Sequence, residues 1–149
     1  MLIRTHLVIT IFFILVFLSS VNNKLIFVLT ALFATFLPDI DTRYSKLGKR
    51  KLARILQFFT KHRGMIHSFT FLLSITLVLV LVLPVFAFGF FLGYGLHLLA
   101  DSFTITGIRF FYPSKKKITG NLKTGGRFES FIFLIFVVLD LILSYMIVL

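Results

Sequence analysis

The stretch Gly93-Tyr94-Gly95-Leu96-His97-Leu98-Leu99-Ala100-Asp101 places a histidine and a carboxylate four residues apart inside an apolar run. On an α-helix, residues four apart lie on the same face, one turn from each other. An imidazole and a carboxylate at this spacing can bind one metal ion together. Buried in a bilayer without such a partner, both side chains would be costly. The stretch therefore predicts a helix that carries part of a polar site.

The composition of the chain is that of an integral membrane protein. Its 149 residues predict a single membrane-embedded domain over residues 1–149. The chain is 58% hydrophobic, with a mean hydropathy of +1.03. It contains no cysteine, which excludes disulfides, thiolate metal sites and cysteine nucleophiles. Any bound metal must therefore be held by nitrogen and oxygen atoms.

Five apolar stretches predict an all-α bundle of about five transmembrane helices. A helix of about 20 apolar residues crosses a hydrocarbon core. The predicted helices cover residues 5–20, 24–37, 65–83, 86–103 and 128–149. Asn22-Asn23, Pro38 and Pro84 mark breaks between them. Gly89 and Gly93 form a small-residue face, which suits either packing within the bundle or a dimer.

The basic segment of residues 42–64 predicts a further helix that lies on the membrane surface. Its apolar residues Leu52, Ile55, Leu56 and Phe59 follow the helical spacing i, i+3, i+4 and i+7. Lysines and arginines surround them in the sequence. This pattern is typical of an amphipathic interfacial helix.

The positive charges predict how the chain is oriented. With five crossings, the N-terminus and both long loops (residues 42–64 and 104–127) lie on one side. All of the 16 Lys and Arg residues except Lys24 lie on that side. The positive-inside rule makes this side cytoplasmic, so the C-terminus is expected outside. The net charge of +11 predicts contact with anionic lipid headgroups rather than with nucleic acid, because the basic residues flank membrane segments.

The same topology brings the ionisable residues together. All four histidines and four of the five acids are predicted at the cytoplasmic face, and only Asp140 falls elsewhere. The candidate ligands are His6, Asp39, Asp41, His62, His67, His97 and Asp101, with Glu129 as a further possibility. Mixed imidazole and carboxylate ligation favours zinc, with manganese or iron as alternatives, and this number of groups suits one to three ions.

A metal at this face predicts hydrolysis, because a bound metal lowers the pKa of water toward neutrality. His62 or a spare carboxylate such as Asp41 is the candidate general base. Arg63 and Arg127 lie beside the ligand motifs and are candidates to stabilise developing negative charge. The expected substrate is a phosphorylated or lipid-like molecule that reaches the site from the membrane.

Three motifs resemble the YdjM-type family of membrane-bound, metal-dependent hydrolases. They are Leu-Pro-Asp-Ile-Asp at 37–41, His-Arg-Gly-Met-Ile-His-Ser at 62–68 and His-Leu-Leu-Ala-Asp-Ser-Phe-Thr at 97–104. Thr5-His6 and the stretch 124–129 match the two ends of the family pattern. The resemblance implies a hydrolase with all seven candidate ligands around the metal. More distantly, the order of ligands is similar to zinc-dependent phospholipase C and P1-type nucleases, although this chain has no tryptophan.

Two other functions remain open from the sequence. A metal-binding transporter or sensor subunit would use the same ligands, but it needs an ion path with more polar residues across the membrane. A structural membrane protein would instead use a polar clasp, a hydrogen-bonded pair of His97 and Asp101 that joins helices and binds no metal. Glu129 has a simpler explanation as an acid that favours a helix N-terminus.

Overall fold

The computed structural model describes residues 1–40, 65–114 and 116–149. The described residues form five α-helices and no strand, which confirms the all-α prediction. The helices are α1 (Ile3–Phe17), α2 (Lys24–Ile40), α4 (Phe69–Val82), α5 (Pro84–Ser102) and α6 (Arg127–Val148). The predicted interfacial helix within residues 42–64 lies outside the described residues, and so do Asp41, His62 and Arg63.

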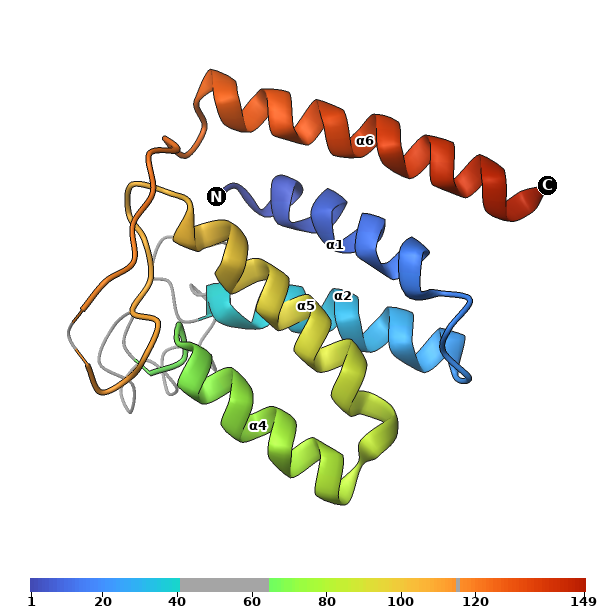
Figure 1. The fold of residues 1–149 in the computed structure, drawn as a ribbon, viewed down its shortest axis with the longest axis horizontal. Helices are drawn as coiled ribbons and strands as arrows, with labels where there is room; N and C mark the ends of the chain where they lie inside the picture. The colour runs from blue at the N-terminus through green and yellow to red at the C-terminus, as the bar shows by residue number, and fades with distance from the viewer. Residues whose placement is uncertain (41–64, 115) are drawn as a thin grey trace.

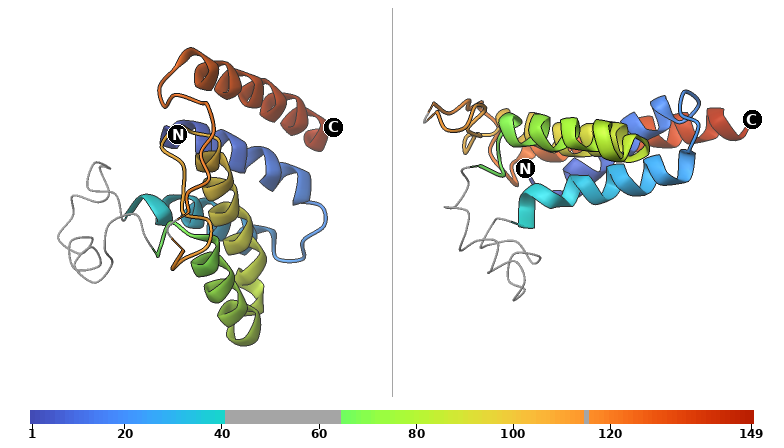
Figure 2. Two further views of the ribbon diagram at one scale, coloured as in Figure 1. Left: turned by 60° about the vertical axis from the view of Figure 1, so that its left-hand side comes forward. Right: turned by 90° about the horizontal axis from the view of Figure 1, so that it is seen from below.

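The helices run up and down in one bundle, with the ends of the chain on opposite sides of it. Figure 1 shows the N-terminus, the end of α5 and the start of α6 at one end of the bundle. The C-terminus and the α1–α2 and α4–α5 connections lie at the other end. Helix α5 packs against α2 and α4, while α1 packs against α2, α5 and α6. The turned views in Figure 2 show α6 as an outer helix beside α1.

Helices α2 and α5 make the closest contact in the bundle, and two glycines allow it. A Cβ atom added at Gly93 would lie 2.0 Å from the carbonyl oxygen of Ala31. A Cβ atom added at Gly89 would lie 2.8 Å from the carbonyl oxygen of Phe27. Small residues let helix backbones approach in this way. The small-residue face therefore serves packing within the bundle.

The prediction of about five transmembrane helices is confirmed only in part, because three of the described helices are shorter than a full membrane span. Helices α1, α2 and α4 have 15, 17 and 14 residues. At about 1.5 Å per residue they are roughly 21–26 Å long, less than a hydrocarbon core of about 30 Å. Only α5 and α6, with 19 and 22 residues, are long and apolar enough to cross a membrane among the described residues.

Two helix boundaries differ from the prediction, and both bear on the site. Helix α2 continues through Pro38 to Ile40, so Asp39 lies on the last described turn of a helix rather than after it. Helix α4 begins at Phe69, because the Ser68 side chain accepts a hydrogen bond from the Phe71 N–H and caps the helix. His67 therefore lies in the turn before α4.

The loop between α5 and α6 folds back on itself beside the bundle. Its backbone is held by paired hydrogen bonds between Ile108 and Ile118, at 2.9 and 3.0 Å. Ile108 is buried and joins a core with Leu72, Tyr94 and Leu98. The loop thus covers the end of the bundle where α5 ends and α6 begins (Figure 1).

Replacing Gly93 by alanine is expected to lower the unfolding temperature of the detergent-purified protein. The added methyl group collides with the α2 backbone, and overpacking of this kind costs about 1–3 kcal/mol. Gly95→Ala is the matched control, because its added Cβ would lie 3.4 Å from the Leu72 Cδ2 atom and meets no backbone. Thermal melts followed by circular dichroism compare the two variants. A Gly93→Ala variant as stable as Gly95→Ala would contradict the close contact.

Candidate metal centre

Five of the predicted ligands meet at the end of the bundle that holds the N-terminus. They are His6 from α1, Asp39 from α2, His67 from the turn before α4, and His97 and Asp101 from α5. They form two overlapping groups that could hold a metal ion, His6–His97–Asp101 and Asp39–His67–His97. In each group the ligand atoms lie within 4.8 Å of one another. The convergence expected from the up-and-down topology is confirmed for these five residues.

His97 is the residue that both groups share, and its ring is held in one orientation. Its Nδ1 donates a hydrogen bond to the carbonyl oxygen of Thr35 at 2.8 Å. In a neutral imidazole this leaves the lone pair on Nε2. That atom is buried without a hydrogen-bond partner, 3.8 Å from Asp39 Oδ1 and from Asp101 Oδ2. Metal-binding histidines are typically oriented by such a bond from the other ring nitrogen.

His6 and His67 approach Asp101 from two sides. The Nε2 atom of His6 lies 3.3 Å from Asp101 Oδ1, and the Nε2 atom of His67 lies 3.3 Å from Asp101 Oδ2. The His6 ring stacks on the His97 ring, with centroids 3.9 Å apart and planes inclined by 6°. The N-terminal ammonium group of Met1 donates a hydrogen bond to Asp101 Oδ1 and forms an ion pair with it. Asp101 is thus the central carboxylate of the cluster.

The cluster is buried, although its carboxylates remain partly accessible. The three histidine side chains are at most 4% exposed, whereas Asp101 keeps 14% and Asp39 keeps 22%. A divalent cation would offset the cost of burying both carboxylates. Asp39 and Asp101 are therefore the members of the cluster that remain accessible from outside the bundle.

The donor atoms fit a metal that accepts mixed nitrogen and oxygen ligands. Ring nitrogens of His6, His67 and His97 are buried without hydrogen-bond partners, which is unusual for polar atoms in an interior. Imidazole with carboxylate suits zinc, manganese or iron better than magnesium or calcium, which prefer oxygen alone. The residues present therefore fit the predicted ion.

Polar groups behind the ligands hold the surrounding backbone in place. The Thr35 hydroxyl lies 3.0 Å from the Thr10 hydroxyl and donates to the Ala31 carbonyl at 2.8 Å, which ties α1 to α2. The Tyr94 hydroxyl donates to the Ile66 carbonyl at 2.6 Å and fixes the turn that contains His67. The sequence reasoning did not identify these residues. Thr35 orients His97 through its backbone carbonyl, and this contact leaves no signal in residue type. Tyr94 stands in the glycine-flanked stretch.

Comparison with protein-family models matches residues 1–148 to the family described as YdjM inner membrane protein. The chain belongs to this family. The match confirms the resemblance to the YdjM family and supports a membrane location, but it gives no support for the hydrolase activity that the resemblance implied. Neither a search of curated proteins nor a search of solved structures finds a match. The more distant likeness to phospholipase C and P1-type nucleases therefore has no support from these comparisons.

Glu129 of this YdjM-family chain lies apart from the two ligand groups. Its carboxylate accepts hydrogen bonds from the Leu2 N–H at 2.6 Å, the Thr5 hydroxyl at 2.9 Å and the Gly125 N–H at 2.6 Å. Glu129 is 2% exposed, and these three donors engage both of its oxygens. The residue joins the start of α6 to the start of α1. It therefore positions the helix that carries His6.

Two further charged residues, Arg127 and Asp140, lie on α6 and belong to neither ligand group. Arg127 is exposed at the first position of α6. Asp140 lies farther along α6, with one buried carboxylate oxygen that has no hydrogen-bond partner among the described residues. It is absent from both ligand groups, as the sequence predicted.

Glu129→Ala is expected to destabilise the protein by several kcal/mol, because it removes three hydrogen bonds to a charged carboxylate, at about 1.5–3 kcal/mol each, and leaves the buried Thr5 hydroxyl without this partner. The unfolding temperature in detergent should fall clearly below that of the parent. Ser130→Ala is the matched control, because that hydroxyl is exposed and makes a single long contact of 3.4 Å with the Gly126 carbonyl. If Glu129→Ala and Ser130→Ala had the same unfolding temperature, Glu129 would not hold α1 and α6 together.

Proposed function

We propose that this protein is an integral membrane metal-dependent hydrolase whose His/Asp site lies at the cytoplasmic interface. The proposal rests on one observation, the orientation of the His97 ring. Its Nδ1 donates a hydrogen bond to the Thr35 carbonyl. Its Nε2 is buried, has no hydrogen-bond partner, and lies 3.8 Å from a carboxylate oxygen of Asp39 and of Asp101. A purely structural histidine would satisfy both nitrogens.

The proposed membrane arrangement has five crossings with the N-terminus inside. Helices α5 and α6 span fully, and the bilayer thins locally around the shorter helices, as hydrophobic mismatch allows. The distribution of lysine and arginine favours a cytoplasmic location for the end of the bundle that holds His6 and Asp101.

His97 holds a single ion in this proposal, because one imidazole nitrogen has one lone pair. His6, Asp39, His67 and Asp101 complete the ligand set around it, and zinc is the favoured ion. When bound, a divalent ion acidifies water and polarises a phosphoryl or carbonyl oxygen. Thr35 keeps the His97 ring aimed at the ligand position, and α1 and α5 keep bulk water away from the histidines.

The proposed reaction is hydrolysis of a phosphoester in a phosphorylated or lipid-like substrate. The oxygen of water bonds to phosphorus, the bond from phosphorus to the leaving oxygen breaks, and the leaving oxygen takes up a proton. His62 or Asp41 removes the proton from water as general base. Arg63 or Arg127 stabilises the negative charge that develops on the phosphoryl oxygens.

Elemental mass spectrometry of the detergent-purified protein tests the metal centre. We expect about one equivalent of zinc, manganese or iron per chain, because His97 can ligate one ion. His97→Gln with Asp101→Asn should lose this metal while keeping the circular dichroism spectrum of the parent. Asp140→Asn is the matched control, because it removes an acid outside both ligand groups. No metal in the parent, even after incubation with each ion, would refute the proposal.

Turnover distinguishes a hydrolase from the alternative of a metal-binding transporter or sensor subunit. The metal-loaded protein should release product from a bis(p-nitrophenyl) phosphate or phospholipid panel, and chelation should abolish release. Asp101→Asn should lower the rate by at least about 10–100-fold, because changing even the hydrogen-bond partner of a metal ligand typically costs this much. Tight metal binding without hydrolysis of any ester in the panel would favour the transporter or sensor.

A further inference from the structure

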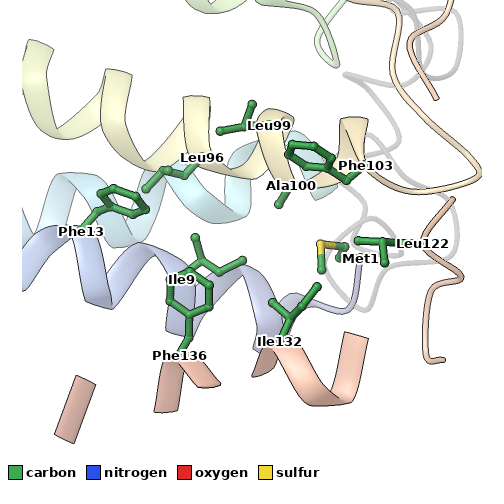
Figure 3. A pocket seen from close by; sticks show the side chains of 10 residues that line it. All are labelled: Met1, Ile9, Phe13, Leu96, Leu99, Ala100, Phe103, Leu122, Ile132 and Phe136. Carbon is green, nitrogen blue, oxygen red and sulfur yellow. The ribbon is translucent and has the colours of Figure 1, made fainter. Parts of the chain in front are cut away.

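An apolar groove lies between α1, α5 and α6, separate from the His/Asp cluster (Figure 3). Ile9 and Phe13 of α1 face it, together with Leu96 of α5 and Phe136 of α6. Every residue that lines the groove has an apolar side chain. Its volume is about 320 Å³, at the lower end of the range for small-ligand sites. An apolar space of this kind offers water no hydrogen-bond partners.

One end of the groove reaches the candidate metal centre. Met1 lines the groove, and its N-terminal ammonium group donates a hydrogen bond to the Asp101 carboxylate. Ala100 also lines the groove and directly precedes Asp101 on α5. A hydrocarbon chain in the groove would thus have one end beside the carboxylate and histidine cluster.

Positive charges stand near this same end. Arg4 is exposed on the first turn of α1, and its guanidinium carbon lies 5.3 Å from the centre of the Phe133 ring on α6. Lys123 is exposed and follows Leu122, another residue that lines the groove. Arg127 is exposed at the start of α6. These charges complement an anionic headgroup, whereas the groove itself complements a hydrocarbon chain.

We propose that the groove binds the hydrocarbon chain of an anionic membrane lipid and places its phosphate at the His/Asp centre. The inference rests on the proposed hydrolase function and names its substrate class. The lipid enters sideways from the bilayer, and its chain lies along α1 between α5 and α6. Because the chain moves from one apolar environment to another, packing against the groove wall and the charge of the phosphate decide the preference for the groove.

Tryptophan fluorescence can test the groove directly, because the chain contains no tryptophan. Phe136→Trp, and separately Phe13→Trp, place a single tryptophan in the wall of the groove. Phe131→Trp is the matched control on α6, at a position that is 62% exposed and does not line the groove. The probe is a long-chain alkyl phosphate that carries bromine on its chain, titrated into protein in detergent micelles.

We expect saturable quenching that removes most of the emission at position 136 or 13, and only weak, unsaturated quenching at position 131. Unbrominated alkyl phosphate of the same length should reverse the quenching, while glycerol phosphate should not. The corresponding alcohol should compete less well, because it lacks the phosphate charge. Equal, unsaturated quenching at all three positions would mean simple partitioning into the micelle and would overturn the proposal.

Metal content, measured on the same samples, separates this proposal from the proposed function. Bound metal without saturable quenching would overturn the lipid groove and leave the hydrolase in place. Saturable quenching in a protein that binds no metal would support the groove as a lipid site and refute the hydrolase. Light scattering gives the particle mass. A dimer that dissociates in Phe136→Trp would assign the groove to a second copy of the chain and overturn the proposal.

Discussion

Helix α5 lies so close to α2 at Gly93 that no Cβ atom fits between their backbones, and this contact sets the register of the site. Gly93 meets Ala31, and one turn later on both helices His97 meets Thr35. The hydrogen bond between the His97 ring and the Thr35 carbonyl is possible because the two backbones already touch. Its consequence is the direction of Nε2, which faces the two carboxylates.

The cluster depends on contacts that join distant parts of the chain. Glu129 at the start of α6 holds the start of α1, which carries His6. Thr10 and Thr35 tie α1 to α2 deeper in the bundle. A change in the packing of α6 would therefore move a ligand that belongs to a different helix. The family match over residues 1–148 agrees with a unit in which both ends of the chain contribute to one site.

A structural clasp and a metal centre make different demands on the hydrogen bonds of this cluster. A clasp gains stability when each buried polar atom has a partner, because unpaired groups in a low-dielectric interior are costly. Here His67 Nε2 has a hydrogen bond with Asp101, whereas the described contacts leave His97 Nε2 and both ring nitrogens of His6 without one. The His97 ring is held by the Thr35 carbonyl and by stacking on His6. Such an arrangement fixes the direction of lone pairs, which is the property that a metal ligand needs.

The sequence by itself determined the all-helical class, the membrane location and the gathering of His6, Asp39, His67, His97 and Asp101 at one end. It could do so because apolar run length defines helices, and because helices in an up-and-down bundle bring every second helix end to the same face. Helix length was less predictable, since Ser68 shortens α4 and Pro38 does not stop α2. Only the tertiary structure decided the His97 orientation, the role of Glu129 and the apolar groove. These features depend on backbone carbonyls and on distances between helices, which residue types and their spacing along the chain do not encode.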